Sequence, residues 1–329
     1  MRRLHDSRDA GAGRARSGRL PLSRLLFHRA PVVTRTLSRN WVHVVLATVP
    51  VMWGLNFVTT RILLDRWDAL SFITVRFLIM VAIAFPWAYA TGTLRPVERR
   101  DWTALIVAGV CGIALYQFCF VFSLEHTSVF ASSLLASVFP LFTMAGAAAL
   151  GEERPSSLRW AGALVAFAGI AIFEGIFAGR ATFRLGDLLA LGASLTFAPY
   201  TLIVRRLRDR YAPVPLLAMT MGIGTVVLAA VGTHATLHQN YAALDRTDWL
   251  LFAYVVIFPI LIGYALLNWG IARIGAGPAT MYAFGVPIVG GFAGAAVFRT
   301  PIPAYEIVGA AVCIGGLVIA QTAGEKRSA

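Results

Sequence analysis

Long apolar stretches alternate with short polar joints along most of the chain. Each apolar window is about 20 residues long, enough to cross the hydrocarbon core of a bilayer as a helix. Backbone amides have no water to bind inside a bilayer, so each window must satisfy its own hydrogen bonds as a helix. The predicted spans are approximately 42–63, 69–90, 102–123, 128–149 and 157–177, followed by 185–204, 212–232, 249–271, 277–298 and 303–322.

The composition agrees with this pattern. Hydrophobic residues make up 58% of the 329 residues and charged residues only 14%, and the mean hydropathy is +0.71. A soluble domain carries about a quarter charged residues. We therefore predict an all-α polytopic membrane protein with about ten transmembrane helices.

The net charge of +13 is concentrated at the N-terminus, where ten arginines lie in residues 1–40. We interpret this segment as a basic, disordered cytoplasmic arm that orients the first helix and contacts anionic lipid. The alternative is an over-extended start that the expressed protein lacks. No RNA- or DNA-reading motif accompanies the arginines, so nucleic acid is not an expected partner.

The remaining Lys and Arg residues predict the orientation of the spans. With the N-terminus inside, twelve of them lie in cytoplasmic segments, six lie outside and one lies within a span. Because cytoplasmic loops carry an excess of Lys and Arg, both termini are predicted to be cytoplasmic, in the cell inner membrane. The short tail at 323–329 lies on the same side.

The chain repeats itself at an offset of 147 residues. Pro140 corresponds to Pro287, and Gly162 in the fifth span corresponds to Gly309 in the tenth. Two halves of five spans must run in opposite directions through a membrane, because five is odd. The predicted repeats are residues 41–178 and residues 185–322. Inverted repeats are typical of alternating-access transporters, whose site lies near the midplane between the halves.

Several motifs within the spans resemble one family. The first span carries WGLNF, the second carries VRFLI, and residues 124–170 combine a small-residue helix, a mid-helix proline, a Gly-Glu joint and a glycine-rich span. In this order they resemble the EamA branch of the drug/metabolite transporter superfamily. The resemblance covers roughly residues 41–322 and implies a ten-span transporter of small molecules.

Two positions depart from that family's pattern. Arg299 and Thr300 stand in the second half where the family often repeats the acidic joint Glu152-Glu153. His126 stands where the family usually has lysine or tyrosine. Neither departure changes the predicted fold, but both argue against borrowing a substrate from the family.

Polar and aromatic side chains inside the spans are candidates to line a cavity. Arg76 lies roughly 10 Å from the outer end of its span. It either anchors a carboxylate or phosphate of the substrate, or it snorkels or caps backbone carbonyls. Interhelical hydrogen bonding competes with a cavity role for each candidate, but contributions from both halves favour a cavity. The candidates are Trp53, Asn56, Arg76, Tyr116, Gln117, Tyr200, Tyr264 and Asn268.

Pro140 and Pro287 are predicted to kink the fourth and ninth spans at matched positions. The kinks act either as hinges or as static features that shape the cavity. Both prolines interrupt the same part of their respective repeats, which makes a related role in the two halves the simplest interpretation.

Other chemistry-bearing residues give weaker signals. Three acids, Glu174, Asp187 and Glu306, lie near predicted span ends rather than at depth, where a proton-coupling carboxylate is expected. His234 and His238 are four residues apart in a polar loop, but two histidines without a third ligand do not indicate a metal site. The cysteines have no CxxC spacing and are interpreted as small buried hydrophobes.

Together these features favour a secondary transporter that exports small metabolites, amino acids or drug-like compounds by alternating access. No GxxxxGK[ST] motif is present, and no cofactor is expected. A channel or receptor is the alternative; a membrane-embedded enzyme is less favoured, because the spans supply no nucleophile and base. A proton or another ion is a possible coupling partner, and the sequence indicates neither the substrate nor the oligomeric state.

Overall fold

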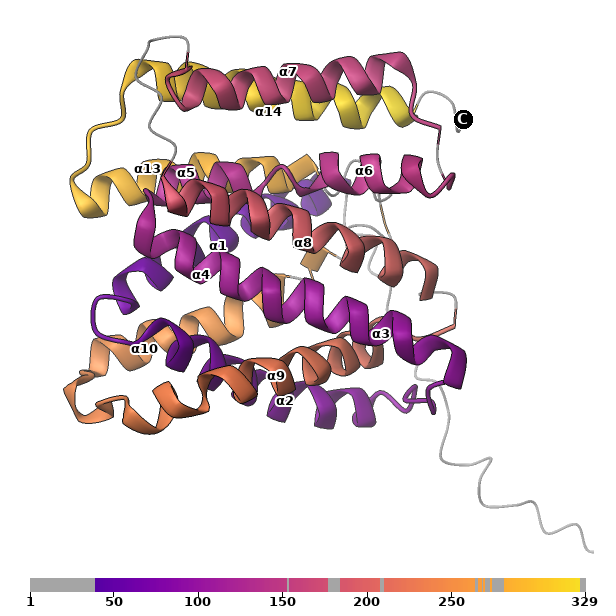
Figure 1. Ribbon diagram of the computed structural model, residues 1–329, viewed down its shortest axis with the longest axis vertical. Coiled ribbons are helices and arrows are strands. Elements are labelled where there is room, and N and C mark those ends of the chain that lie inside the picture. Colours follow the sequence, from indigo (N-terminus) through magenta and orange to yellow (C-terminus); the bar gives the residue numbers. More distant parts are fainter. Residues whose placement is uncertain are drawn as a thin grey trace, which may run out of the picture. The chain divides into compact units, whose positions relative to one another are not determined.

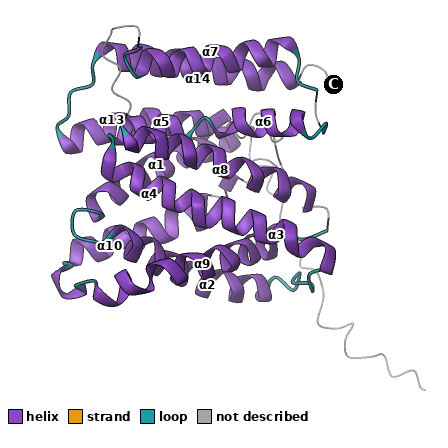
Figure 2. Cartoon of the chain, in the orientation of Figure 1, coloured by secondary structure: helices purple, strands orange, loops and turns teal. Residues whose placement is uncertain are grey.

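The computed structural model describes residues 39–152, 154–176, 184–207, 210–263, 266–267, 269, 273 and 281–325. These residues form helices joined by short connections, with no strand among them (Figure 2). The helices of the first half are α1 (Arg39–Leu63), α2 (Ala69–Ala90), α3 (Trp102–Gly109), η3 (Val110–Leu115), α4 (Tyr116–His126), α5 (Val129–Ala136), α6 (Phe139–Ala149) and α7 (Ser157–Phe173). Those of the second half are α8 (Leu185–Leu207), α9 (Pro213–His238), α10 (Arg246–Val256), η6 (Ile257–Ile262), η7 (Met281–Gly285), α13 (Val286–Phe298) and α14 (Ala304–Glu325). Short 3₁₀ turns, η2 (Arg99–Asp101) and η5 (Tyr241–Ala243), precede α3 and α10.

Six helical stretches among the described residues are long and apolar enough to cross a membrane, and three shorter apolar helices accompany them. The long ones are Trp41–Leu63, Ala69–Ala90, Arg99–His126, Val129–Ala149, Leu185–Leu207 and Pro213–His238. The shorter ones are Ser157–Phe173, Tyr282–Phe298 and Ala304–Ala320. The expected eighth span, 249–271, is described only in part, as the end of α10 and η6.

The fifth span is shorter than the apolar pattern predicted. It was expected to reach residue 177, but α7 ends at Phe173. Gly175 follows with φ of +68°, a left-handed conformation that glycine adopts without steric cost and that commonly terminates helices. The helix therefore stops at a glycine C-cap although the apolar residues continue.

Two histidines predicted to lie in a loop are helical instead. His234 and His238 belong to the last turns of α9, and their rings stack at 4.2 Å between centroids. Despite the polar composition there, the helix continues and ends at His238. No group of three metal-ligating side chains occurs in the described part of the chain.

Close backbone contacts join α7 to α14, which lie side by side at the top of Figure 1. A Cβ atom added at Gly316 would lie 2.3 Å from the backbone nitrogen of Ala166, and one at Gly169 would lie 2.3 Å from that of Cys313. Small residues allow helices in a bilayer to approach this closely and to gain van der Waals contact. On the other side of the bundle, α2 packs against α9 in the same view.

Two helices are interrupted at positions 147 residues apart. A π-helical segment, η3, separates α3 from α4, and a second, η6, follows α10 in the other half. π-helical insertions are rare, and they are frequent at functional sites. The offset between them equals that of the sequence repeat.

A second matched interruption lies at the two prolines that were predicted to kink the fourth and ninth spans. The fourth span breaks between α5 and α6, and Pro140 stands in the first turn of α6. Likewise, Pro287 stands in the first turn of α13, directly after η7. Proline lacks the N–H that would otherwise be unbonded at a first turn. Each proline thus stands where its span is interrupted, and its role as a hinge or as a static kink stays a prediction.

Candidate functional site

A small cavity lies among helices of both halves. It is bounded by α2, η3, α4, α8, α9 and η6, and its volume is about 20 Å³. This is about the space that one water molecule requires. Both π-helical segments reach it, through Gly112 and Ile113 of η3 and through Ile260 of η6. The other lining residues are Phe77, Tyr116, Gln117, Phe197, Tyr200, Leu217 and Met221.

Aromatic rings form one wall of this cavity. Phe197 of α8 lies between Tyr116, at 4.9 Å between ring centroids, and Tyr200, at 5.0 Å. Such separations are typical of attractive aromatic pairs. Gly112 allows Tyr200 its position, because a Cβ atom there would lie 2.3 Å from the Cβ of Tyr200. The η3 backbone therefore approaches α8 directly behind the aromatic wall.

Gln117, which lines the cavity, carries a buried polar atom without a partner. The residue is 6% exposed, and no hydrogen-bond donor in the described part of the chain contacts its Oε1 atom. A buried carbonyl oxygen without a donor costs about 1–3 kcal/mol. Such a group in a native protein calls for an explanation, and a bound donor is one.

Arg76 lies beside this cavity and makes bonds to the protein itself. Its side chain is 1% exposed, and Nη2 donates to Oδ1 of Asn56 at 3.1 Å and to the backbone oxygen of Val255 at 2.9 Å. The Val255 oxygen would normally accept from the residue four positions later, but that residue is Pro259, which has no N–H. The arginine therefore caps a carbonyl that a proline has freed.

This geometry excludes snorkelling and supports the capping interpretation of Arg76, whereas contact with a substrate stays a prediction. A guanidinium that snorkels would be exposed, whereas the Arg76 side chain is buried. It lies in the first half of the chain and donates to a backbone oxygen of the second half. The amide of Asn56, whose place in an apolar helix was unexplained by the sequence, accepts one of its bonds. Arg76 and Asn56 thus form a buried polar link between α1, α2 and α10.

Trp53 adds a second link between the halves. Its Nε1 donates to the backbone oxygen of Pro259 at 2.6 Å. On the same side of α1, Tyr254 donates from its hydroxyl to the backbone oxygen of Met52 at 3.0 Å. These bonds hold α1 against the helix that contains η6. Trp53 and Asn56, the two candidates in the first span, therefore position the cavity wall without lining it.

Replacing Arg76 by lysine is expected to lower the free energy of unfolding by about 1–3 kcal/mol, because lysine has no nitrogen at the position of Nη2, which donates both bonds to Asn56 and Val255. Thermal unfolding of the detergent-solubilised protein measures this change. The KM for substrate is expected to stay near the wild-type value. An unchanged melting temperature combined with a raised KM for anionic substrates would instead place Arg76 in contact with the substrate.

Three of the eight predicted residues line the cavity and three lie beside it. Tyr116, Gln117 and Tyr200 form part of its wall, whereas Trp53, Asn56 and Arg76 form the adjoining links. Tyr264 and Asn268 lie outside the described residues.

Sequence reasoning missed Phe197, Gly112 and Pro259. Phe197 and Gly112 resemble ordinary packing residues and gave no signal of a cavity role. Pro259 did give one, since a proline within an apolar span frees a carbonyl that needs a donor.

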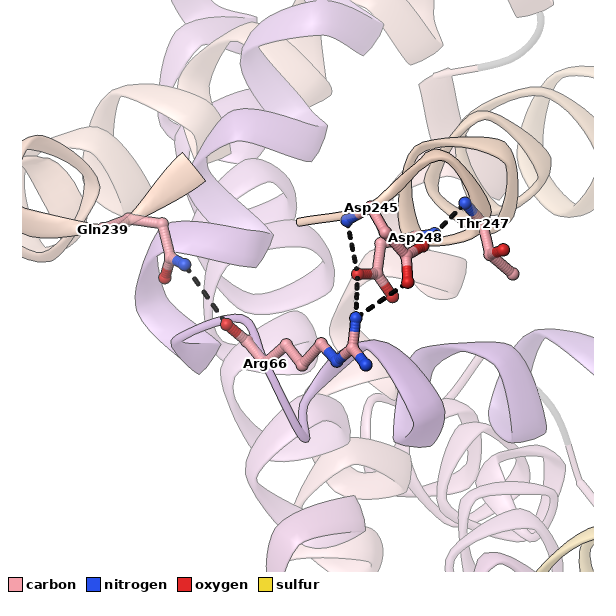
Figure 3. Close-up of polar contacts among 5 residues, drawn as sticks. All are labelled: Arg66, Gln239, Asp245, Thr247 and Asp248. Carbon is pink, nitrogen blue, oxygen red and sulfur yellow. Dashed lines mark hydrogen bonds and ion pairs between the residues drawn. The ribbon is translucent and has the colours of Figure 1, made fainter. Parts of the chain in front are cut away.

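Ion pairs join helices at both ends of the bundle. Arg66, in the turn after α1, donates from Nη1 to Asp245 at 2.8 Å and to Asp248 at 3.2 Å, at the start of α10 (Figure 3). Gln239 donates to the Arg66 backbone oxygen at 3.2 Å (Figure 3). The backbone N–H of Asp248 and the Arg66 guanidinium both hold the pKa of Asp245 below its ordinary value.

Different residues pair at the opposite end. Glu152, after α6, pairs with Arg205 at 2.8 Å and also with Arg206 of α8, and these two arginines lower the pKa of Glu152. Asp101 accepts hydrogen bonds from Arg210 at 2.6 and 2.8 Å. Both ends of the bundle therefore carry polar contacts between separate segments.

Comparison with known proteins identifies the family. The profile of the EamA-like transporter family matches residues 40–174 and again residues 184–322. The chain belongs to the EamA-like transporter family. The resemblance found in its motifs is thereby confirmed, and with its long apolar helices the protein is a multi-pass membrane transporter of small molecules.

Curated relatives carry transporter names. The "Uncharacterized transporter YyaM" of Bacillus subtilis is 26% identical over 71% of this chain and 77% of its own. The "Probable terminal-alkyne amino-acid exporter" of Streptantibioticus cattleyicolor is 26% identical over 85% of this chain and 93% of its own. The "Probable amino-acid metabolite efflux pump" of Salmonella typhimurium is 26% identical, covering 82% and 91%.

A solved crystal structure shares the fold. It superposes on 89% of this chain and on 100% of its own, with a TM-score of 0.60 and 20% sequence identity. At this identity the likeness concerns the arrangement of helices alone.

Proposed function

We propose that this EamA-family protein is a secondary transporter that exports small amine-bearing metabolites, such as amino acids or their derivatives, by alternating access. The observation that carries the proposal is the buried, unpartnered Oε1 of Gln117, a residue that lines a cavity between the two halves. Two relatives named as amino-acid or amino-acid-metabolite exporters support the substrate class.

The chemistry of the wall suits such a substrate. Gln117 Oε1 accepts a hydrogen bond from an ammonium or amine, and the rings of Tyr116, Phe197 and Tyr200 contact an apolar body and attract a cation. The guanidinium of Arg76 already bonds to Asn56 and Val255, so an anionic anchor is not required of it. Cavities of this kind combine apolar walls with few polar groups.

We further propose ten spans arranged as two inverted repeats. The two matches to the family profile, the two π-helical segments and the two proline-started helices all recur at corresponding places in the halves. Such repeats place the site at their interface near the midplane. With both termini on the cytoplasmic side of the inner membrane, the Arg66 contacts close the outer end and the Glu152 contacts close the inner end.

The present conformation then corresponds to a closed state. A cavity of about 20 Å³ is smaller than any metabolite, so binding requires α8, η3 and η6 to separate. The breaks before α6 and α13 are suited to act as hinges, because their carbonyls and amides lie outside continuous helices.

A ligand screen tests this proposal. Detergent-solubilised protein is heated in the presence of amino acids, amino-acid amides and carboxylates that lack the amine. A ligand present at 100 times its Kd stabilises the folded state by about 2.7 kcal/mol. We expect amine-bearing compounds to raise the melting temperature and their deaminated counterparts to have no effect. Stabilisation by the carboxylates alone would contradict the substrate class.

Loosening the outer ion pairs is expected to favour the outward-open state. In Arg66→Gln the contacts to Asp245 and Asp248 are lost. A cysteine introduced as Met221→Cys in a variant without native cysteines should then react severalfold faster with a membrane-impermeant thiol reagent added outside. High salt should produce part of the same effect in the wild-type background, because exposed ion pairs are screened.

The neighbouring Arg246→Gln serves as the matched control, since this exposed arginine of α10 makes no ion pair with another described residue. It should leave the labelling rate unchanged. Equal rates in both variants would show that the Arg66 contacts do not hold the outer end closed.

A further inference from the structure

Three carboxylates from different helix ends lie within electrostatic reach of one another where α7 ends. Glu174 follows the last residue of α7, Asp187 lies in the first turn of α8, and Glu306 lies in the first turn of α14. All three belong to the end that the predicted orientation places outside. Their negative charges act on one another, and Arg184, just before α8, is the nearby cation that partly offsets them.

Each carboxylate oxygen of Asp187 accepts a hydrogen bond within the protein. It is 2% exposed, and its two oxygens accept bonds from the hydroxyl of Thr127 and from the backbone N–H of Arg184, the latter at 2.7 Å. Both oxygens of Asp187 are therefore already bonded within the protein.

Glu174 is in the opposite situation. It is 7% exposed, and its Oε1 atom has no hydrogen-bond partner among the described residues. A carboxylate in this position is desolvated, has one oxygen without a donor and is repelled by two neighbours, all of which favour a bound proton. Burial first, then Asp187 and Glu306, raise the pKa of Glu174 to about 7 from its ordinary 4.5.

A proton fits this site better than a metal ion does. The described residues contain no group of three side chains placed to hold a metal. A single proton on Glu174 removes the repulsion between α7 and the starts of α8 and α14 without requiring further ligands.

We propose that Glu174 is a proton-binding site that links closure of the outer end to the pH outside. A proton taken from the outer water forms an O–H bond on the Glu174 carboxylate, and the neutral side chain lets α7 close against α8 and α14. When that proton returns to the water, repulsion from Asp187 and Glu306 separates these helix ends. The transport consequence rests on the proposed function, whereas proton binding itself does not.

The sign of the effect follows from the raised pKa. Below about pH 4.5, Glu174 is protonated whether the chain is folded or unfolded, and the stabilising contribution of its neutral form is fully present. That contribution is lost as the pH rises through about 7. Glutamine imitates the neutral carboxyl at every pH.

Thermal unfolding of the full-length protein from pH 5 to pH 8 tests proton binding. Glu174→Gln should melt at the wild-type temperature at pH 5 and several degrees higher at pH 8. Glu306→Gln, which removes one repelling charge, should move the wild-type midpoint to lower pH. The exposed Glu98→Gln is the control and should follow the wild-type curve. Parallel curves for wild type and Glu174→Gln would overturn the proposal.

Transport in liposomes then tests the link to closure. Exchange of an amine-bearing substrate by wild-type protein should change as the outer pH crosses about 7, and exchange by Glu174→Gln should not. An identical pH response in both proteins would overturn the link. If wild-type protein exchanges no substrate, the proposed function fails, while the unfolding curves still decide whether Glu174 binds the proton.

Discussion

Replacing Gln117 by leucine is expected to lower kcat/KM for an amine-bearing substrate by about tenfold to a hundredfold. The change removes the Oε1 acceptor on the cavity while keeping a side chain of similar size. A hydrogen bond to a charged group contributes about 1.5–3 kcal/mol, and each 1.4 kcal/mol is a factor of ten. Uptake of radiolabelled substrate into liposomes that contain the purified variant measures the loss.

The same substitution is expected to leave the protein as stable as the wild type or more stable. Oε1 has no donor in the described structure, so its removal relieves a desolvation cost instead of breaking a bond. Phe118→Leu, on the exposed side of the same helix, is the matched control for transport. A large fall in melting temperature for Gln117→Leu would mean that the amide holds the fold, which would contradict its assignment to the substrate.

Replacing Gly316 by alanine is expected to cause the largest loss of stability among the proposed variants. The new methyl group would lie 2.3 Å from the backbone nitrogen of Ala166 and 2.7 Å from the oxygen of Gly162. Neither atom can turn aside as a side chain can, so α7 and α14 must separate along their length. Overpacking costs about 1–3 kcal/mol or more, and thermal unfolding in detergent should show a fall of several degrees.

The next residue provides the control. A methyl group at Gly315 meets no atom within 4 Å, so Gly315→Ala carries no packing cost. Alanine is favoured over glycine in a helix by about 1 kcal/mol, and the variant should melt at the same temperature or slightly higher. Equal melting temperatures for the two variants would show that α7 and α14 are not in close contact.

The sequence predicted the helical fold because a bilayer leaves few alternatives. An apolar window of sufficient length must be a helix, and the long helices lie where those windows were read. Ends were less predictable, since Gly175 stopped α7 early and α9 continued through His234 and His238. Local caps decide such ends, and hydropathy does not register them.

The candidate site was only partly predictable. Polarity within apolar helices pointed to Tyr116, Gln117 and Tyr200, all of which reach the cavity. The same signal selected Trp53 and Arg76, which instead bond to backbone oxygens that Pro259 and its neighbours expose. A buried polar residue requires a partner, but the sequence does not say whether that partner is a substrate or another helix.

The cluster around Glu174 shows a second limit of the sequence. Each of its three acids was judged singly by its depth in a span, and none was central. Their proximity depends on how α7, α8 and α14 pack, which no single segment encodes.

Counterflow tests the central claim most directly, namely that this EamA-family protein carries amine-bearing metabolites through the cavity at Gln117. Liposomes with purified protein are loaded with unlabelled amino acid and diluted into a trace of the labelled compound. A carrier transiently concentrates the label inside. Each transporter that releases unlabelled substrate outside can return with labelled substrate, and the unlabelled substrate inside competes with the label for the way out. We predict a transient overshoot that saturates with substrate concentration and is reduced at least about tenfold in Gln117→Leu. Label that enters without overshoot or saturation, or an overshoot that Gln117→Leu leaves unchanged, would contradict this account.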